Sequence, residues 1–190
     1  MAVRERGGRS DTETQPLCLQ FTKTVTARET ATPRDSLLRP SDLAEWLAAA
    51  GLGGRPPGLD EELLREAREL RESIYRAARA VADAQEMAEA DRDRINDWAG
   101  RNDAFRVLDG AGVNWRFPGS SPARSALAVV AGDAVDTVRG RPVGTDKGWA
   151  GSGCRRGVLD ATRGRFRRWC SMSTCGNRAK KDAMRVRGAQ

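Results

Sequence analysis

A long amphipathic helix is predicted by the segment from Leu59 to Ala84, which reads LDEELLREARELRESIYRAARAVADA. Its apolar side chains recur at intervals of three and four residues, so they share one face of a helix. They are Leu59, Leu63, Leu70, Ile74, Ala77 and Val81. Acidic residues fill the first turn at positions 60–62, where negative charge suits the helix dipole. The segment therefore predicts a helical body that buries this apolar stripe.

The chain before this helix is less regular. Residues 1–15 are polar and lack periodicity, which predicts a disordered N-terminal segment. Leu17, Leu19 and Phe21 then alternate with other residues, a pattern that fits either a short strand or the start of a helix. Residues 22–40 are rich in Thr, Arg and Pro and predict a loop.

A shorter helix is predicted between this loop and the long helix. Ser41 is expected to cap its start, and Gly51 is expected to end it. Its apolar residues at helical spacing are Leu43, Trp46, Leu47 and Ala50. Residues 51–58 contain four glycines and two prolines, and they predict a break before the long helix.

Three further elements are predicted after the long helix. A helix from about Glu86 to Asn102 is expected to turn Met87, Ile95 and Trp98 inward. Asp109-Gly110, between the β-prone runs 106–108 and 113–117, predicts a hairpin whose turn type is open. Residues 121–139 predict a last helix, and residues 140–148 a linker rich in Gly and Pro.

Composition excludes several kinds of site. The 190 residues include no histidine, which removes His-based acid–base catalysis, the Ser-His-Asp triad and His-containing metal sites. No Gly-rich phosphate loop of the P-loop or dinucleotide type occurs. No apolar run approaches the roughly 20 residues that span a bilayer, and the N-terminus has no apolar signal region. We therefore expect a cytoplasmic protein that is not an enzyme.

Charge is distributed unevenly along the chain. Residues 147–190 carry 12 basic and two acidic side chains, a net charge of +10, whereas the preceding 146 residues have a net charge of −3. A mildly acidic body joined to a strongly basic tail is typical of an attached nucleic-acid-binding module. The alternative is an arginine-rich composition without such a role.

Cysteine spacing indicates a metal site in the basic tail. Cys170 and Cys175 are separated by four residues, and a Cys-x4-Cys pair can present two thiolates to one zinc ion. Cysteines in an intracellular chain favour metal binding over disulfides. Cys18 lies far from this pair and is expected to be a small buried residue. A reactive thiol or a remote zinc ligand is the alternative for Cys18.

Basic residues surround the cysteine pair. Residues 177–186 predict a helix on which Arg178, Lys181 and Arg185 share one face. Such a surface would neutralise phosphates and make affinity fall with salt. For Arg178 and Lys180, a structural role within the module is the alternative. The candidate nucleic-acid contacts are Arg163, Arg165, Arg167, Arg168, Arg178, Lys180, Lys181, Arg185 and Arg187.

The run RRWCSMSTCGNRAKK, residues 167–181, resembles the signature of the CGNR zinc-finger family, bacterial proteins regarded as transcriptional regulators. The resemblance implies a second Cys-x4-Cys knuckle upstream. Cys154 matches its second ligand, but Trp149 stands where the first cysteine is expected.

The resemblance therefore implies the zinc ligands Cys154, Cys170 and Cys175, one fewer than the four that structural zinc takes. Water, Asp146, Asp160 or Cys18 could supply a fourth ligand. Alternatively, the site binds zinc weakly, or the finger keeps its shape without zinc by packing Trp149 and Trp169.

The body of the chain resembles the ABATE domain that accompanies the CGNR finger. Its members open with a Leu-x-Leu-Asp-Phe-x-Asn-Thr-like stretch, and residues 17–24 read LCLQFTKT here. Gln20 and Lys23 thus replace the usual Asp and Asn. The segment from Leu70 to Tyr75 also fits a Leu-Arg-x-x-(apolar)-Tyr pattern of the family.

The predicted fold is mainly α: a helical ABATE-like domain over residues 16–140 with a small hairpin, then a zinc-ribbon- or treble-like module over residues 147–190. The resemblance implies a regulator that binds DNA through the finger, with a helical body that senses an effector or forms a homodimer. The alternatives are an RNA-binding protein, a partner- or small-ligand-binding module with a degenerate structural finger, and a zinc-dependent enzyme.

Overall fold

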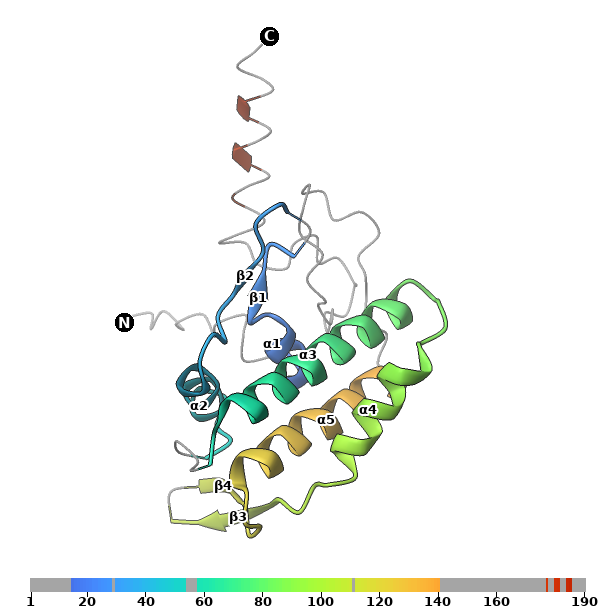
Figure 1. Cartoon of the computed structure of the whole chain (residues 1–190). Coiled ribbons are helices and arrows are strands. Elements are labelled where there is room, and N and C mark those ends of the chain that lie inside the picture. Colours follow the sequence, from blue (N-terminus) through green and yellow to red (C-terminus); the bar gives the residue numbers. More distant parts are fainter. Residues whose placement is uncertain are drawn as a thin grey trace, which may run out of the picture.

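Five helices and two small antiparallel hairpins make up the part of the chain up to Gly140 that the computed structural model describes (Figure 1). The described residues are 15–28, 30–53, 58–110, 112–140 and, near the C-terminus, Asn177, Lys180, Lys181, Met184 and Arg185. The prediction of a mainly α body with a hairpin is confirmed. The N-terminal segment before Gln15 and most of the finger module lie outside these residues.

Helix α3 (Glu61–Ala82) is the long helix predicted from its apolar stripe. Asp60 caps it, because its carboxylate accepts the backbone N–H of Leu63 at 2.8 Å. The stripe faces the core, where Leu70 and Ile74 are fully buried. The helix thus carries the centre of the body, as its periodicity predicts.

Helix α1 (Leu17–Thr22) resolves the segment whose pattern fitted either a strand or a helix. Cys18, Leu19 and Phe21 are all buried, and α1 packs against α3 and α5. Because a short helix buried on most sides shows no polar face, its sequence carries no 3.6-residue period.

A minimal hairpin lies within the segment predicted as a loop. β1 (Val25–Thr26) pairs antiparallel with β2 (Arg34–Asp35), with Val25 opposite Asp35. Strands of two residues are too short to show the alternation by which strands are recognised in sequence.

Helix α2 (Pro40–Ala49) follows, and the prediction that Ser41 caps it is wrong. Arg39 is the N-cap residue, and the carboxylate of Asp42 accepts its backbone N–H at 2.8 Å. Pro40 takes the first helical position, where its missing N–H is not needed. The helix therefore starts one residue before Ser41.

Helix α4 (Glu89–Ala99) is shorter than predicted at both ends. After it, β3 (Phe105–Asp109) pairs antiparallel with β4 (Gly112–Arg116), which confirms the predicted hairpin. Asp109 lies opposite Gly112, so two residues connect the strands. This β3–β4 hairpin stands at the edge of the body, with β3 as its outer strand (Figure 1).

Helix α5 (Pro122–Gly140) completes the body and packs against α1, α3 and α4 (Figure 1). Its buried side chains are mostly small, as at Ala126, Ala131 and Ala134, which lets the neighbouring helices approach closely. Among the described helices, none combines the length and the apolar character needed to cross a membrane.

Candidate functional site

Five residues of the predicted finger module are described, and all five are helical and exposed. The helix predicted over residues 177–186 is confirmed at these positions. Lys181 and Arg185 stand one turn apart, so they lie on the same side of the helix, with Lys180 beside them. Their contact with nucleic acid stays a prediction.

The other predicted site residues lie outside the described part of the chain. They are the cysteines Cys154, Cys170 and Cys175 and the arginines Arg163, Arg165, Arg167, Arg168, Arg178 and Arg187. The three cysteines can each bind zinc through a thiolate, whereas the indole of Trp149 is not a zinc ligand. These three cysteines are therefore one fewer than the four ligands of a tetrahedral structural site. Within the described residues, no group of three Cys, Asp or Glu side chains could hold a metal ion.

Cys18 is a buried residue in the core, as predicted, with 1% of its surface exposed. Its Sγ lies 3.5 Å from the hydroxyl of Thr137, and its backbone N–H donates to the carboxylate of Asp133 at 2.8 Å. Burial, together with the nearby Asp133, raises the pKa of the thiol. Since zinc binds the thiolate, this environment argues against Cys18 as a remote ligand.

A buried arginine, Arg71, joins α3 to the β1–β2 segment. Its guanidinium donates to the two carboxylate oxygens of Asp35 at 2.8 and 2.7 Å and to the hydroxyl of Thr24 at 3.1 Å. It also donates to Glu72 at 2.9 Å. Glu72 in turn accepts from Arg28 at 3.1 Å. These five residues form the Arg71 network.

Two further contacts extend the Arg71 network along α3. The guanidinium of Arg28 lies over the ring of Tyr75, 4.1 Å from its centre. Arg68 donates to the backbone carbonyl of Leu37 at 2.8 Å. Arg71 and Tyr75 are both positions of the Leu-Arg-x-x-(apolar)-Tyr run. The run thus fastens the segment between α1 and α2 onto the long helix.

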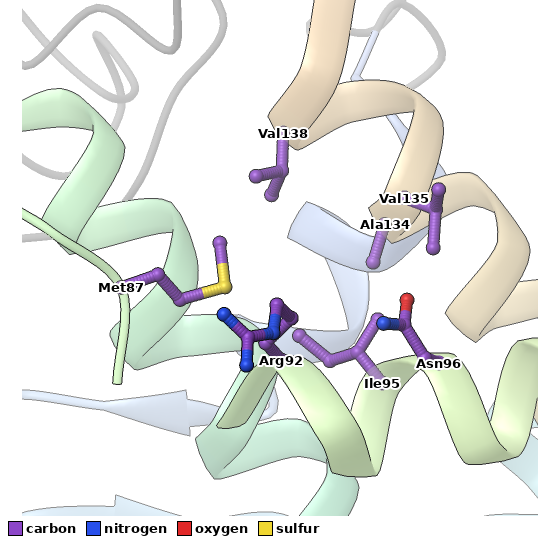
Figure 2. A pocket seen from close by; sticks show the side chains of 7 residues that line it. All are labelled: Met87, Arg92, Ile95, Asn96, Ala134, Val135 and Val138. Carbon is purple, nitrogen blue, oxygen red and sulfur yellow. The ribbon is translucent and has the colours of Figure 1, made fainter. Parts of the chain in front are cut away.

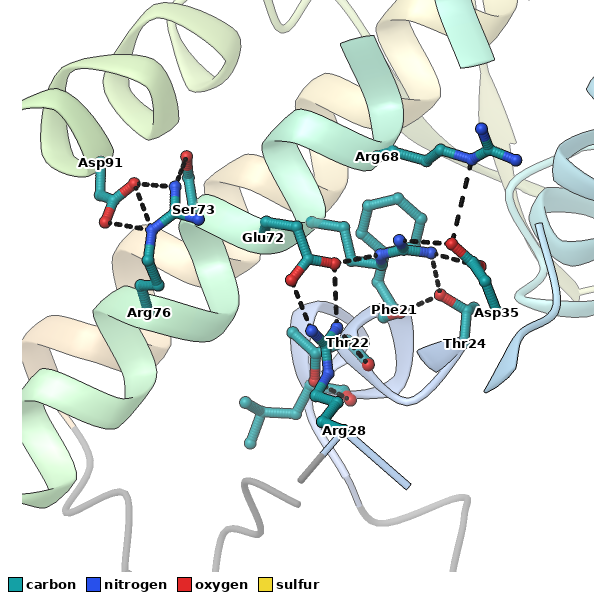
Figure 3. A network of polar contacts seen from close by, with 12 residues as sticks. Phe21, Thr22, Thr24, Arg28, Asp35, Arg68, Glu72, Ser73, Arg76 and Asp91 are labelled. Carbon is teal, nitrogen blue, oxygen red and sulfur yellow. Dashed lines mark hydrogen bonds and ion pairs between the residues drawn. The ribbon is translucent and has the colours of Figure 1, made fainter. Parts of the chain in front are cut away.

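A second ion pair joins α3 to α4. Arg76 donates to both oxygens of the buried carboxylate of Asp91, with the closest contacts at 2.5 and 2.8 Å, and lies within 3.3 Å of the hydroxyl of Ser73 (Figure 3). The hydrogen bonds from Arg76 hold the pKa of Asp91 below its ordinary value.

The carboxylates of the Arg71 network are held in their charged form. Desolvation alone would raise the pKa of Asp35, but hydrogen bonds from Arg71 and the backbone N–H of Leu37 outweigh it and lower that pKa. The same balance holds at Glu72, where Arg28 lowers the pKa against desolvation. Groups that stay ionised and paired in this way position the backbone and are poor proton donors at neutral pH.

Acid is expected to destabilise the domain through these carboxylates. The pKa values of Asp35, Glu72 and Asp91 are lower in the folded protein than the ordinary values of 3.8 for Asp and 4.5 for Glu. Their contribution is therefore complete above the unfolded pKa and is lost as pH falls through the folded pKa. We expect the free energy of unfolding to fall steadily below about pH 5. Denaturant titrations at a series of pH values from neutral to acid measure this free energy.

The matched variant for this experiment is Asp35→Asn, which removes one of the titrating groups. Its free energy of unfolding should fall less steeply with acid than that of the unchanged protein, although it starts lower at neutral pH. An equally steep acid slope in the variant would mean that Asp35 does not contribute to the pH dependence.

A pocket of about 220 Å³ lies between α4 and α5 (Figure 2). Its wall is almost wholly apolar and comes from Met87, Arg92, Ile95, Asn96, Ala134, Val135 and Val138. The guanidinium of Arg92 is engaged by Glu89 at 3.0 Å. Such a lining suits a small apolar group, because specific binding of a polar effector requires converging polar side chains.

The Arg71 network was missed by the sequence analysis, although one signal was present. Arg71 stands three residues before Ile74 and next to Leu70, on the apolar stripe of the long helix. A charged side chain in a buried stripe signals a buried partner. That partner, Asp35, lies 36 residues away in a segment without periodicity, so the sequence alone does not identify it.

Family models match both parts of the chain. Residues 15–141 match the ABATE family, described as "Putative stress-induced transcription regulator". Residues 150–188 match the CGNR zinc finger. Among curated proteins, none matches this chain. The first match covers the whole helical body, including the Arg71 network and the pocket.

Proposed function

The chain belongs to the ABATE family and carries a CGNR zinc-finger region, and on this basis we propose that it is a transcriptional regulator that binds DNA through its finger module. In this proposal the helical domain is the sensing or dimerisation body. Helix α5 is described as far as Gly140, ten residues before the finger match begins, so it is the described element of the body nearest to the finger in the sequence.

The observation that carries the proposal is the basic surface of the finger region. Lys180, Lys181 and Arg185 are exposed on helical residues inside the matched range 150–188. They belong to the tail with the net charge of +10. Exposed cations on one helix bind phosphate oxygens of a nucleic-acid backbone, and this attraction is weakened by salt.

The proposed role is binding rather than catalysis. The buried or half-buried carboxylates Asp35, Glu72 and Asp91 are each paired with an arginine, which supports a structural role for them. The finger family indicates zinc, which stabilises the fold of small modules when it is bound. Because the chain's cysteines fall one short of the usual set, the DNA proposal rests on the basic surface and not on the metal.

The test of DNA binding is to measure the affinity for duplex DNA at several salt concentrations, with fluorescence anisotropy as the signal. We expect the logarithm of the affinity to fall linearly with the logarithm of salt concentration. The double variant Lys181→Ala/Arg185→Ala should bind more weakly and reduce this slope by about 0.9 for each phosphate that it no longer neutralises. The matched control is Arg65→Ala/Arg101→Ala, which removes the same charge from exposed positions of the body and should leave the slope unchanged.

Other outcomes separate the alternatives. Tighter binding to RNA than to duplex DNA would favour an RNA-binding protein. No binding of either at low salt, with the body folded, would contradict the proposal. That result would favour a partner- or small-ligand-binding module, and the pocket between α4 and α5 is the observation that supports this second candidate.

A further inference from the structure

The β3–β4 hairpin carries most of the exposed large apolar side chains of the described residues. Five large apolar side chains of the described residues are exposed, and three of them lie on this hairpin: Phe105, Leu108 and Val113. Leu108 is 83% exposed and lies directly opposite Val113 across the two strands. Neighbouring exposed apolar side chains are a feature of surfaces at which proteins interact.

The outer edge of β3 also carries unpaired backbone groups. Within the described residues, β3 pairs with β4 alone. Asp109 and Gly112 flank the two-residue connection, so hydrogen bonds to β4 fall on Phe105, Val107 and Asp109. The N–H and C=O groups of Arg106 and Leu108 therefore point away from β4, where a further strand can pair with them.

The charged side chains of the hairpin find their partners within it. Asp109 accepts from Asn114 at 3.0 Å and lies 3.6 Å from the guanidinium of Arg116. The guanidinium of Arg106 lies over the ring of Trp115, 5.6 Å from its centre. A partner strand thus meets backbone groups and the side chains of Leu108 and Arg106 at this edge, and the guanidinium of Arg106 already lies over an aromatic ring.

We infer that the occupant of this edge is the β3 strand of a second copy of the chain, paired antiparallel to form a four-stranded sheet across a two-fold axis. In a two-fold interface every contact occurs twice: if one residue of the first copy faces a second residue of the other copy, the same two residues also face each other with the copies exchanged. With the axis at Val107, Arg106 of each copy faces Leu108 of the other. These are the two residues whose backbone groups are unpaired.

Charge and strand length together select this register. Centred on Val107, the strands place Val107 against itself and Phe105 opposite Asp109, so no like charges face each other. A shift of two residues toward the N-terminus would place Arg106 opposite Arg106, and like charges directly opposite are unfavourable in a sheet. A shift in the other direction moves Arg106 opposite Gly110, beyond the paired strand. The strand is therefore complementary to its own copy in one register.

The interface is small, because each strand has five residues. We therefore expect a reversible dimer whose population rises with protein concentration, as is usual for contacts below the standard interface size. The dimer would carry two finger modules, but its formation does not depend on whether these modules bind DNA.

The experiment is sedimentation velocity of the full chain over a range of concentrations, without nucleic acid. The unchanged protein should shift from monomer to dimer as concentration rises. Leu108→Pro removes an N–H that β4 does not use, and Leu108→Lys places a charge at the edge. Since a two-fold dimer contains each change twice, both variants should weaken the dimer about tenfold or more.

The control is Leu38→Lys, which removes another exposed leucine, 65% exposed, outside the hairpin. It should dimerise like the unchanged protein. A protein that stays monomeric at all concentrations overturns the inference. So does a dimer that persists in both Leu108 variants, or one that Leu38→Lys weakens equally. If Leu108→Pro disturbs the hairpin fold, Leu108→Lys decides between these outcomes.

Discussion

Replacing Arg71 with methionine is expected to lower the free energy of unfolding by about 3 kcal/mol. The side chain is 4% exposed, and its loss leaves Asp35 and the hydroxyl of Thr24 without their shared donor. Removing one partner of a buried ion pair costs about 3–5 kcal/mol. The side chain of Asp35 is 27% exposed, so water can solvate part of the carboxylate that loses its partner. We therefore expect a loss at the lower end of this energy range. Denaturant unfolding followed by circular dichroism measures the change.

Arg65→Met is the matched control, because it makes the same replacement on the same helix. Arg65 is exposed and pairs with Glu69 at 2.7 Å, one turn away. Pairs of this kind contribute about 0.3–0.5 kcal/mol. Adding Asp35→Asn to Arg71→Met should recover part of the loss, since the double variant no longer holds an unpaired carboxylate. If Arg71→Met costs no more than Arg65→Met, the Arg71 network does not stabilise the fold.

Replacing Trp149 with cysteine is expected to tighten zinc binding about a hundredfold. The resemblance to the finger family implies two Cys-x4-Cys knuckles, and this change supplies the cysteine that it implies at position 149. Structural zinc contributes about 10–16 kcal/mol in small modules with four ligands, so one thiolate corresponds to about 3 kcal/mol. Competition with a chromophoric chelator measures the affinity, and elemental analysis of protein purified without chelator measures zinc per chain.

Trp149→Ser controls for the loss of the indole, because it removes the tryptophan without adding a thiolate. It should leave the zinc affinity at the level of the unchanged protein. Adding Cys175→Ser to the Trp149→Cys variant should abolish the gain. If the unchanged protein already binds one zinc as tightly as the Trp149→Cys variant, three cysteines and another group complete the site, and the missing cysteine has no cost.

Local patterns in the sequence predicted the elements whose signals are local. The stripe around Leu70 predicted α3, and Asp-Gly predicted the β3–β4 hairpin. Gly51, at φ +75°, ends α2 as expected, since glycine adopts this conformation without strain. The start of α2 was missed because Pro40 and Asp42 together outweigh the capping preference of Ser41.

Pairings between distant segments could not be predicted in this way. The pairing of Arg71 with Asp35 depends on how the loop folds back onto α3, and no spacing rule encodes that. The exposed edge of β3 is likewise invisible in sequence, because Leu108 would be equally apolar in a buried strand. For the finger, the sequence identified candidate residues, and the structure adds the helical, exposed state of Lys180, Lys181 and Arg185.

The buried thiol of Cys18 is a probe for opening of the domain. It lies in α1 and contacts Thr137 in α5, 119 residues along the chain. An alkylating reagent reaches it only when α1 separates from α5. The rate at which Cys18 is alkylated in native buffer, read by peptide mass spectrometry, therefore measures how often the two ends of the domain come apart. Any effector that tightens the body should slow that rate.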